Sequence, residues 1–275
     1  MRLFTIRTPD GTRAARQEDD DVVLLPHPDV GTLLATGADW PDVAATSRGA
    51  RIPLAEADLA PVVPAPKKII CLGMNYRSHI EEMGRDVPPH PTLFAKFARA
   101  LIGARDPILL PPESDQVDWE VELAFVIGHP VRRADPQEAA RAVAGYCVLN
   151  DISMRDWQFR TMQFLQGKTF DRSTPVGPAL VTLDQVGDAT DLLLTCEVDG
   201  EVMQKGRTSD LLFPPVELVR YISTIVTLEP GDLIATGTPA GVGSARNPPV
   251  FLRPGQVVRS RIEGVGELVN ECVSG

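Results

Sequence analysis

The stretch VDWEVELAFVIG, residues 117 to 128, places two glutamates inside an apolar run. In a β-strand, side chains alternate between two faces, so Glu120 and Glu122 would share one face. Their two carboxylates would then lie roughly 7 Å apart along the strand. Ala124 and Val126 fall on the same face, and the opposite face carries the larger apolar side chains, Trp119, Val121, Leu123 and Phe125.

Two interpretations of this pair of glutamates remain open at this point. Ionised carboxylates that are buried without a positive partner cost several kcal/mol each. A hard divalent cation, bound through carboxylate oxygens, would meet both of them at once. Alternatively, the two glutamates form the solvated outer face of an antiparallel strand, and the segment alone fits both interpretations equally well.

The composition limits the class of protein. A chain of 275 residues with 43% hydrophobic residues can form one large domain, or a large one and a small one, with a sizeable core. A net charge of -10 disfavours nucleic acid and membrane surfaces as partners, so a small anionic substrate would need locally placed cations. The four cysteines show no C-x-x-C pairing, and no secretory or membrane-spanning segment is evident. We therefore expect a globular cytoplasmic protein.

A proline-rich stretch divides the chain. The segment ADLAPVVPAPKK, residues 57 to 68, predicts an extended connector. It separates a small β-rich N-terminal domain with its linker, residues 1–64, from a larger domain, residues 65–275. In the small domain we expect strands at residues 2–6 and near residues 21–25, with a turn at TPDG.

Strand signals dominate the larger domain. KIICLGMNY predicts a buried strand that ends at Gly73, and later segments such as GYCVLND, PALVTLD and GDLIATGTP repeat the pattern. DPQEAARAVAG predicts a helix with Asp135 as N-cap and Gly145 after its end. PPVELVRYISTI predicts an amphipathic helix whose apolar face is Leu218, Tyr221, Ile222 and Ile225. An α+β, β-rich fold with a mixed sheet fits better than a doubly wound parallel sheet.

A third carboxylate, Asp151, stands where the apolar strand of GYCVLNDISMRDWQ ends. Strand ends commonly display binding side chains, and three carboxylates with water or substrate would complete an octahedron around a cation. A helix-capping aspartate is the equally compatible alternative. Arg155 and Gln158, three residues apart, would face the same way and could hold a substrate carboxylate. Lys168 could supply a fixed cation, although most lysines are solvated.

A histidine and a glutamate form a candidate general base. In NYRSHIEEMG, His79 and Glu82 are three residues apart on a short helical turn that ends at Gly84. The carboxylate could orient the imidazole and raise its basicity. A surface helix with Glu82 in solvent is the alternative.

These spacings together resemble a known family. From Lys68 to its C-terminus the chain is similar to the catalytic domain of the fumarylacetoacetate hydrolase family. The segments that carry the resemblance are GMNYRSHIEEMG, DWEVELAFVIG, GYCVLNDISMRDWQ, GKTFDRSTPVGP, DGEVMQKGRTSDLLF and PGDLIATGTPAGVG. The resemblance implies a mixed sheet rolled into a barrel-like core, a homodimer, and one Mg²⁺ or Mn²⁺ ion.

The resemblance also implies roles for individual residues. The metal ligands would be Glu120, Glu122 and Asp151. His79 and Glu82 would form a dyad on a lid, and the groups on the substrate side would be Lys168, Arg155, Gln158 and Thr238. In FAKFARAL the chain departs from the family pattern at Ala98 and Arg99, so Lys96 is not included in the predicted site. An additional acidic ligand of eukaryotic members has no counterpart, because Leu72 and Gly73 occupy that region.

The expected reaction is hydrolysis of a C–C bond in a 2,4-dioxo acid, an acylpyruvate such as fumarylpyruvate, in aromatic-compound catabolism. A metal-stabilised pyruvate enolate would form as His79 takes a proton from the attacking water and Lys168 shares the negative charge. The alternatives are isomerisation of 2-hydroxyhepta-2,4-diene-1,7-dioate and decarboxylation of oxaloacetate or another β-keto acid. A non-catalytic metal-binding assembly module is the alternative outside enzymes.

Overall fold

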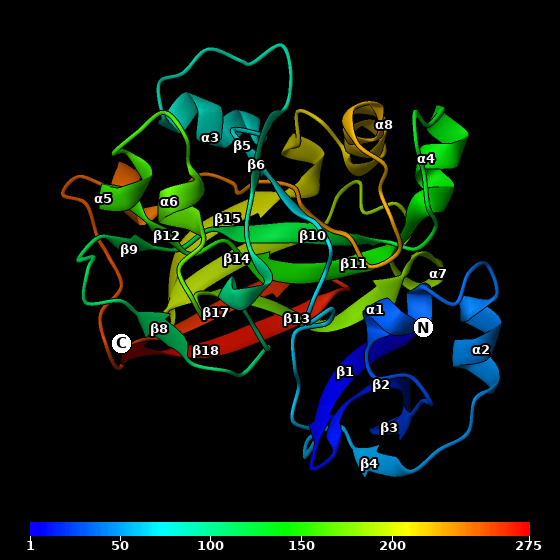
Figure 1. Ribbon diagram of the computed structural model, residues 1–275. Coiled ribbons are helices and arrows are strands. Elements are labelled where there is room, and N and C mark those ends of the chain that lie inside the picture. Colours follow the sequence, from blue (N-terminus) through cyan, green and yellow to red (C-terminus); the bar gives the residue numbers. More distant parts are fainter.

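Two mixed β-sheets pack against each other in the computed structural model, which describes residues 1–275 (Figure 1). The larger sheet has 11 strands and the smaller has 5. Most neighbouring strands are antiparallel, but β16 with β5, β13 with β7 and β18 with β8 are parallel. The expectation of a β-rich mixed fold is therefore confirmed.

The spatial order of the strands differs from their order along the chain. From one edge to the other, the large sheet contains β4 (Arg51–Pro53), β3 (Asp21–Leu24), β2 (Gly11–Glu18), β1 (Arg2–Thr8), β13 (Thr174–Thr182), β11 (Val143–Asn150), β10 (Val121–Ile127), β16 (Leu233–Ala235), β5 (Ile69–Gly73) and β6 (Thr92–Ala95), with β7 (Leu101–Ile102) beside β13. The small sheet contains β15 (Glu201–Arg207), β14 (Leu193–Val198), β17 (Val257–Ile262), β18 (Gly266–Ser274) and β8 (Ile108–Leu110). A separate pair is formed by β12 (Ser153–Met154) and β9 (Val117–Asp118).

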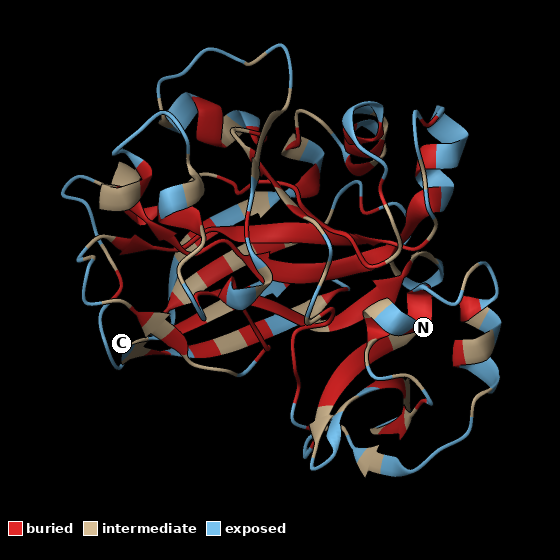
Figure 2. Cartoon of the chain, in the orientation of Figure 1, coloured by how far each residue is buried: buried red, intermediate tan, exposed pale blue.

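The helices are short and lie around the sheets. They are α1 (Val30–Leu34), α2 (Trp40–Thr46), α3 (Arg77–Glu82), α4 (Pro136–Ala142), α5 (Arg155–Gln158), α6 (Leu165–Lys168), α7 (Leu183–Val186) and α8 (Pro215–Ile225). Figure 2 shows that burial concentrates in the strands, whereas the helices keep exposed faces. No helix of the chain is long and apolar enough to cross a membrane.

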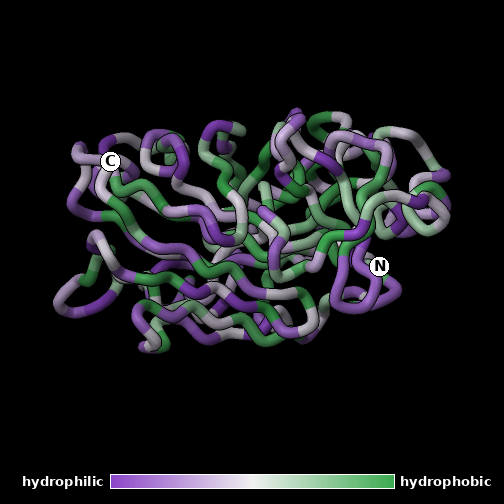
Figure 3. Tube along the Cα trace, turned by 90° about the horizontal axis from the view of Figure 1, so that it is seen from below, coloured by the Kyte–Doolittle hydropathy of each residue, from purple (hydrophilic) through white to green (hydrophobic).

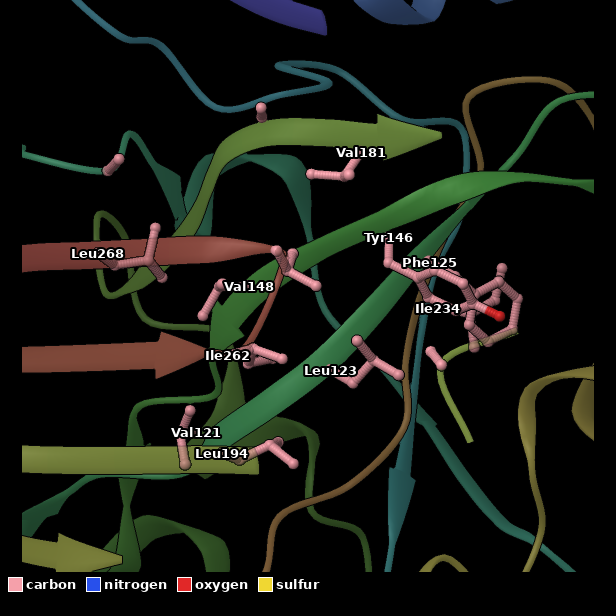
Figure 4. Close-up of a cluster of buried hydrophobic side chains, with 14 of the residues drawn as sticks. Val121, Leu123, Phe125, Tyr146, Val148, Val181, Leu194, Ile234, Ile262 and Leu268 are labelled. Atoms are coloured by element: carbon pink, nitrogen blue, oxygen red, sulfur yellow. The ribbon is translucent and has the colours of Figure 1, made fainter. Parts of the chain in front are cut away.

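Strand β10 lies between two apolar cores, and all of its residues are buried. Val121, Leu123 and Phe125 point into the core between the two sheets (Figure 4). Ala124 and Val126 belong to the second core, on the opposite face of the large sheet. The alternation expected from the sequence is therefore present, and the solvated-face interpretation of the glutamates is excluded because Glu120 and Glu122 are buried.

The outer face of the small sheet is polar. In β17 and β18 buried and more accessible residues alternate, as expected for antiparallel strands with one solvent-exposed face. Figure 3 shows the same alternation of hydrophilic and hydrophobic residues along the chain, seen from below.

The N-terminal residues continue the large sheet. Strand β1 pairs with β13 through Leu3 and Leu180, and the ion pair of Arg7 with Asp106 joins the two parts of the chain. The expected strand at residues 2–6 is present as β1, but β2 was not expected from the sequence. Its buried side chains include Ala14 and Ala15, which are too small to mark a strand in the sequence.

Two predicted helices need correction in detail. Helix α4 begins after the Asp135 cap as expected, but Gly145 lies inside β11 rather than after the helix. A Cβ atom at Gly145 would lie 2.3 Å from the carbonyl oxygen of Val181, so the close approach of β13 requires this glycine. In α8, Tyr221 and Ile225 are exposed, because the buried face is formed instead by Pro215, Leu218, Val219 and Ile222.

Candidate metal centre and active site

Three carboxylates meet at the end of β10 and β11. Glu120 precedes β10, Asp151 follows β11, and the register that pairs Val121 with Asn150 brings these two residues together. Each of Glu120, Glu122 and Asp151 offers an oxygen within 4.8 Å of the others, and all three are buried. The antiparallel pairing of two strands thus builds an all-oxygen cluster from residues that the sequence had singled out.

Cations surround two of these carboxylates. Lys168 Nζ lies 2.7 Å from Glu120 Oε2 and 2.9 Å from Asp151 Oδ2. Lys96 Nζ lies 2.5 Å from Asp151 Oδ1, and Arg155 Nη2 lies 2.7 Å from Glu120 Oε1. Burial disfavours the charge of Glu120, but Lys168 and Arg155 outweigh burial and lower its pKa. Lys96, which the sequence did not place in the site, therefore contacts it directly.

Glu122 is the carboxylate without a cation. Its Oε2 accepts a hydrogen bond of 2.7 Å from the backbone N–H of Gly237, but its Oε1 is buried without any partner. Burial, together with the charges of Asp151 and Glu120, raises the pKa of Glu122 well above its usual range. An orphaned carboxylate oxygen beside two further carboxylates fits a hard divalent cation, because such ions take oxygen ligands.

Arg155 is held in place by Asp118. Its Nε donates to Asp118 Oδ2 at 2.8 Å, and its Nη1 donates to Gln158 Oε1 at 2.8 Å. Asp118 also accepts from the backbone N–H groups of Gly243 at 2.7 Å and Ser244 at 2.9 Å. Arg155 and Gln158 are thus together as predicted, and Asp118 fixes them to the loop after β16. The sequence did not single out Asp118, although it directly precedes Trp119 in the apolar run.

The histidine dyad is formed on α3. His79 Nδ1 lies 2.9 Å from Glu82 Oε2, and Glu82 Oε1 accepts a hydrogen bond of 2.8 Å from Gly241 N–H. Because an ionised carboxylate only accepts hydrogen bonds, Glu82 favours the tautomer with the proton on Nδ1 and leaves Nε2 able to accept one. The arrangement suits a general base, and it is joined to the same loop that Asp118 holds.

One cavity of about 430 Å³ is lined by members of the dyad, of the carboxylate cluster and of the Arg155–Gln158 pair. The polar residues that line its inner part are His79, Glu120, Arg155, Gln158, Lys168 and Thr238. Thr238 donates to the carbonyl oxygen of Val121 at 2.9 Å and accepts from Gln204 Nε2 at 2.8 Å. Gln204 is buried and also accepts a hydrogen bond from Val121 N–H, so it supports Thr238. The sequence did not predict this role, because Gln204 lies in a strand with an exposed side.

Comparisons with known proteins agree with this site. The sequence model of the family described as Fumarylacetoacetate (FAA) hydrolase C-terminal matches residues 68–273. The chain belongs to the fumarylacetoacetate hydrolase family. Members of this family generally use a divalent metal ion, and the Glu120, Glu122 and Asp151 cluster is present in this chain.

Relatives in the fumarylacetoacetate hydrolase family carry three kinds of name. The mitochondrial oxaloacetate tautomerase FAHD2A of Bos taurus is 48% identical over 224 residues, which are 81% of this chain and 71% of that protein. The structure of fumarylacetoacetate hydrolase from Exiguobacterium antarcticum has a TM-score of 0.89 at 34% identity, covering 100% of both chains. The 5-carboxymethyl-2-hydroxymuconate delta-isomerase from Mycobacterium smegmatis has a TM-score of 0.82 at 37% identity, covering 100% of this chain and 99% of that one.

Proposed function

We propose that this chain is a divalent-metal-dependent enzyme that hydrolyses a C–C bond in a 2,4-dioxo acid, an acylpyruvate such as fumarylpyruvate. Glu120, Glu122 and Asp151 are its metal ligands. The observation that carries the proposal is that one cavity is lined both by Glu120, a member of the carboxylate cluster in which Glu122 has a buried unpartnered oxygen, and by His79 of the dyad. A purely structural cluster would have no reason to face a histidine base.

Each side chain of the site has its own role in the proposed hydrolysis. A bound Mg²⁺ or Mn²⁺ ion would supply Lewis-acid stabilisation of the negative charge that develops on the 2-oxo oxygen. Arg155 and Gln158 bind the substrate carboxylate, and Thr238 lies beside them. His79 takes a proton from water as the water oxygen attacks C4, while Glu82 keeps the imidazole oriented. The C3–C4 bond then breaks, C4 leaves as a carboxylic acid, and the electron pair stays on the pyruvate fragment, whose charge Lys168 shares. The proton held by His79 then passes to C3 and completes pyruvate.

The cavity itself favours an acyl chain. About half of its lining is apolar and includes Met74, Met83, Phe94 and Phe164. A four-carbon oxo acid would leave these side chains largely without contacts, whereas an acylpyruvate would bury its carbon chain against them.

Tautomerisation of oxaloacetate is the second candidate, and the name of the bovine relative favours it. That reaction moves a proton between C3 and the 2-oxo oxygen, so it uses His79 and the cluster but needs no nucleophilic water. Isomerisation of a hydroxydienedioate moves a proton in a similar way, as the name of the mycobacterial isomerase suggests. A small keto-acid substrate is common to all of these reactions. We also propose a homodimer and a cytoplasmic location, although the bovine relative is described as mitochondrial.

A panel of acylpyruvates, oxaloacetate and hydroxydienoates with Mg²⁺ or Mn²⁺ tests the proposal. We expect hydrolysis of fumarylpyruvate, and we expect His79→Asn to slow it by about 10²- to 10⁴-fold while sparing much of the decarboxylation of oxaloacetate. His129→Asn, at a half-buried histidine outside the cavity, is the matched control. Acceleration of oxaloacetate tautomerisation without any hydrolysis would replace the first candidate by the second. Turnover of none of these substrates would favour a metal-binding assembly module.

A further inference from the structure

The end of the helix that carries the dyad fixes one more cation. Arg85 N–H donates to the carbonyl oxygen of Ile80 at 3.1 Å, and Gly84 N–H donates to that of Glu81 at 3.0 Å. Gly84 has a φ of +60°, the left-handed conformation that glycine adopts readily. These two bonds form a Schellman motif, so the backbone of Arg85 is set relative to His79 on the same helix.

The side chain of Arg85 lines the cavity of the candidate active site. The other charged groups of this lining are already paired, His79 with Glu82, and Glu120 with both Arg155 and Lys168. Arg85, in contrast, forms no ion pair with any carboxylate of the chain. It is exposed whereas the carboxylate cluster is buried, so Arg85 lies toward the open end of the cavity.

An apolar zone accompanies the two charged regions of the cavity. Met83 precedes Arg85 by two residues on the same turn, and Met74, Phe94 and Phe164 come from the segments around it. Phe94 and Phe164 contact each other edge to face, with ring centroids 5.8 Å apart. Phe94 lies beside the cluster, because Lys168 Nζ is 5.3 Å from the centroid of its ring, and Met83 is two residues from Arg85, so a ligand that reaches from the cluster to Arg85 would bury carbon atoms against these side chains.

We propose that Arg85 binds a second carboxylate at the far end of the substrate. The inference rests on the proposed function for the binding of the first carboxylate at the inner end. A guanidinium group pairs with a carboxylate through two parallel hydrogen bonds, and an unpaired arginine at the mouth is ready to form them. The proposal therefore makes Arg85 the residue by which the site distinguishes a dicarboxylic oxo acid from an acylpyruvate with an uncharged tail.

A matched pair of ligands tests this assignment without any turnover. 2-Oxoadipate and 2-oxohexanoate have the same number of carbons and differ in the distal carboxylate. With Mg²⁺ present, calorimetric titration should show that the wild-type protein binds 2-oxoadipate about tenfold more tightly, which is about 1.4 kcal/mol. Arg85→Gln should remove this preference and leave the affinity for 2-oxohexanoate unchanged. Arg48→Gln, at an exposed arginine outside the cavity, should retain the preference.

The outcomes separate the inference from the proposed function. A wild-type protein without a preference for 2-oxoadipate, an Arg85→Gln variant that keeps it, or equal weakening of both ligands would overturn the role of Arg85. The unchanged affinity for 2-oxohexanoate shows that the variant is folded. Failure of the wild-type protein to hydrolyse fumarylpyruvate contradicts the proposed function instead, and it leaves the binding comparison intact.

Discussion

Replacing Glu122 by glutamine should leave the metal-free protein at least as stable as the wild type, but should make the protein with Mg²⁺ less stable than the wild type. Without metal, Glu122 is a buried carboxylate with an unpartnered Oε1 and no salt bridge to any cation. Glutamine has nearly the same shape, keeps an oxygen for the Gly237 N–H, and carries no charge. The metal-free variant should therefore be at least as stable as the wild-type protein, whereas with Mg²⁺ present the wild-type protein should be the more stable.

The magnitude follows from the geometry of the cluster. At the 4.8 Å that bounds the oxygen separations, two like charges repel by about 3 kcal/mol at an effective dielectric constant of about 20. Lys168 and Lys96 offset part of this repulsion, and protonation of Glu122 removes more, so we expect a gain of about 1 to 2 kcal/mol in the metal-free variant. Mg²⁺ at about 100 times its dissociation constant should stabilise the wild-type protein by about 2.7 kcal/mol. For a chain of this length, the stabilisation of about 2.7 kcal/mol by Mg²⁺ corresponds to a rise of about 5 °C in Tm.

Thermal unfolding of both proteins with EDTA and with Mg²⁺ measures the effect, and Glu56→Gln at an exposed carboxylate is the matched control. Wild type and control should show the full rise in Tm with Mg²⁺, and Glu122→Gln should show little or none. A variant that keeps the whole rise would refute the placement of Glu122 among the ligands. If the Tm of the wild-type protein does not change with either Mg²⁺ or Mn²⁺, the proposed metal centre would be refuted.

Two further predictions concern a supporting carboxylate and the thiols. Asp118→Asn should lower the free energy of unfolding by about 1.5 to 3 kcal/mol in urea, because it leaves the buried Arg155 with Glu120 as its one charged partner, and it should raise KM more than it lowers kcat. An unchanged KM would contradict the positioning role of Asp118. Burial raises the pKa of Cys147 and of Cys196 to about 12, and all 4 cysteines are free and buried. The native protein should therefore not react with a thiol reagent at pH 8, whereas the unfolded chain should react with 4 equivalents of the reagent. Rapid labelling of the native protein would contradict this burial.

The sequence predicts the carboxylates of the site better than it predicts their partners. Glu120 and Glu122 are conspicuous because strand alternation places charges in an apolar run, and Asp151 stands at a strand end. Lys96 is 55 residues from Asp151 along the chain, so only the tertiary structure shows that the two side chains meet. Gln204 is one of several polar residues in a partly exposed strand, and the same pattern would arise if its side chain were solvated.

The same limitation explains the differences in the fold. Large apolar side chains mark β10 and β11, but the only apolar side chains that β2 buries are the small Ala14 and Ala15, one on each face, between charged residues. Helix α4 was predicted from its cap, and its end was misplaced because Gly145 serves the contact with β13 rather than a helix terminus. Local sequence signals therefore identify where an element starts more reliably than they identify a contact between that element and a distant strand.

The position of Arg85 bears on how firmly a bound substrate would hold the candidate base. His79, Glu82 and Arg85 all depend on α3, a helix of 6 residues, and Glu82 ties that helix to the Gly241 loop. A substrate whose far carboxylate engages Arg85 would also hold His79 over the reacting carbon, so binding energy from a remote group would orient the base. A short oxo acid cannot make that contact and would leave the base less constrained. On the proposed role of Arg85, a long dicarboxylic substrate would therefore constrain His79 more firmly than a short oxo acid, although the inner end of the cavity is the same for both.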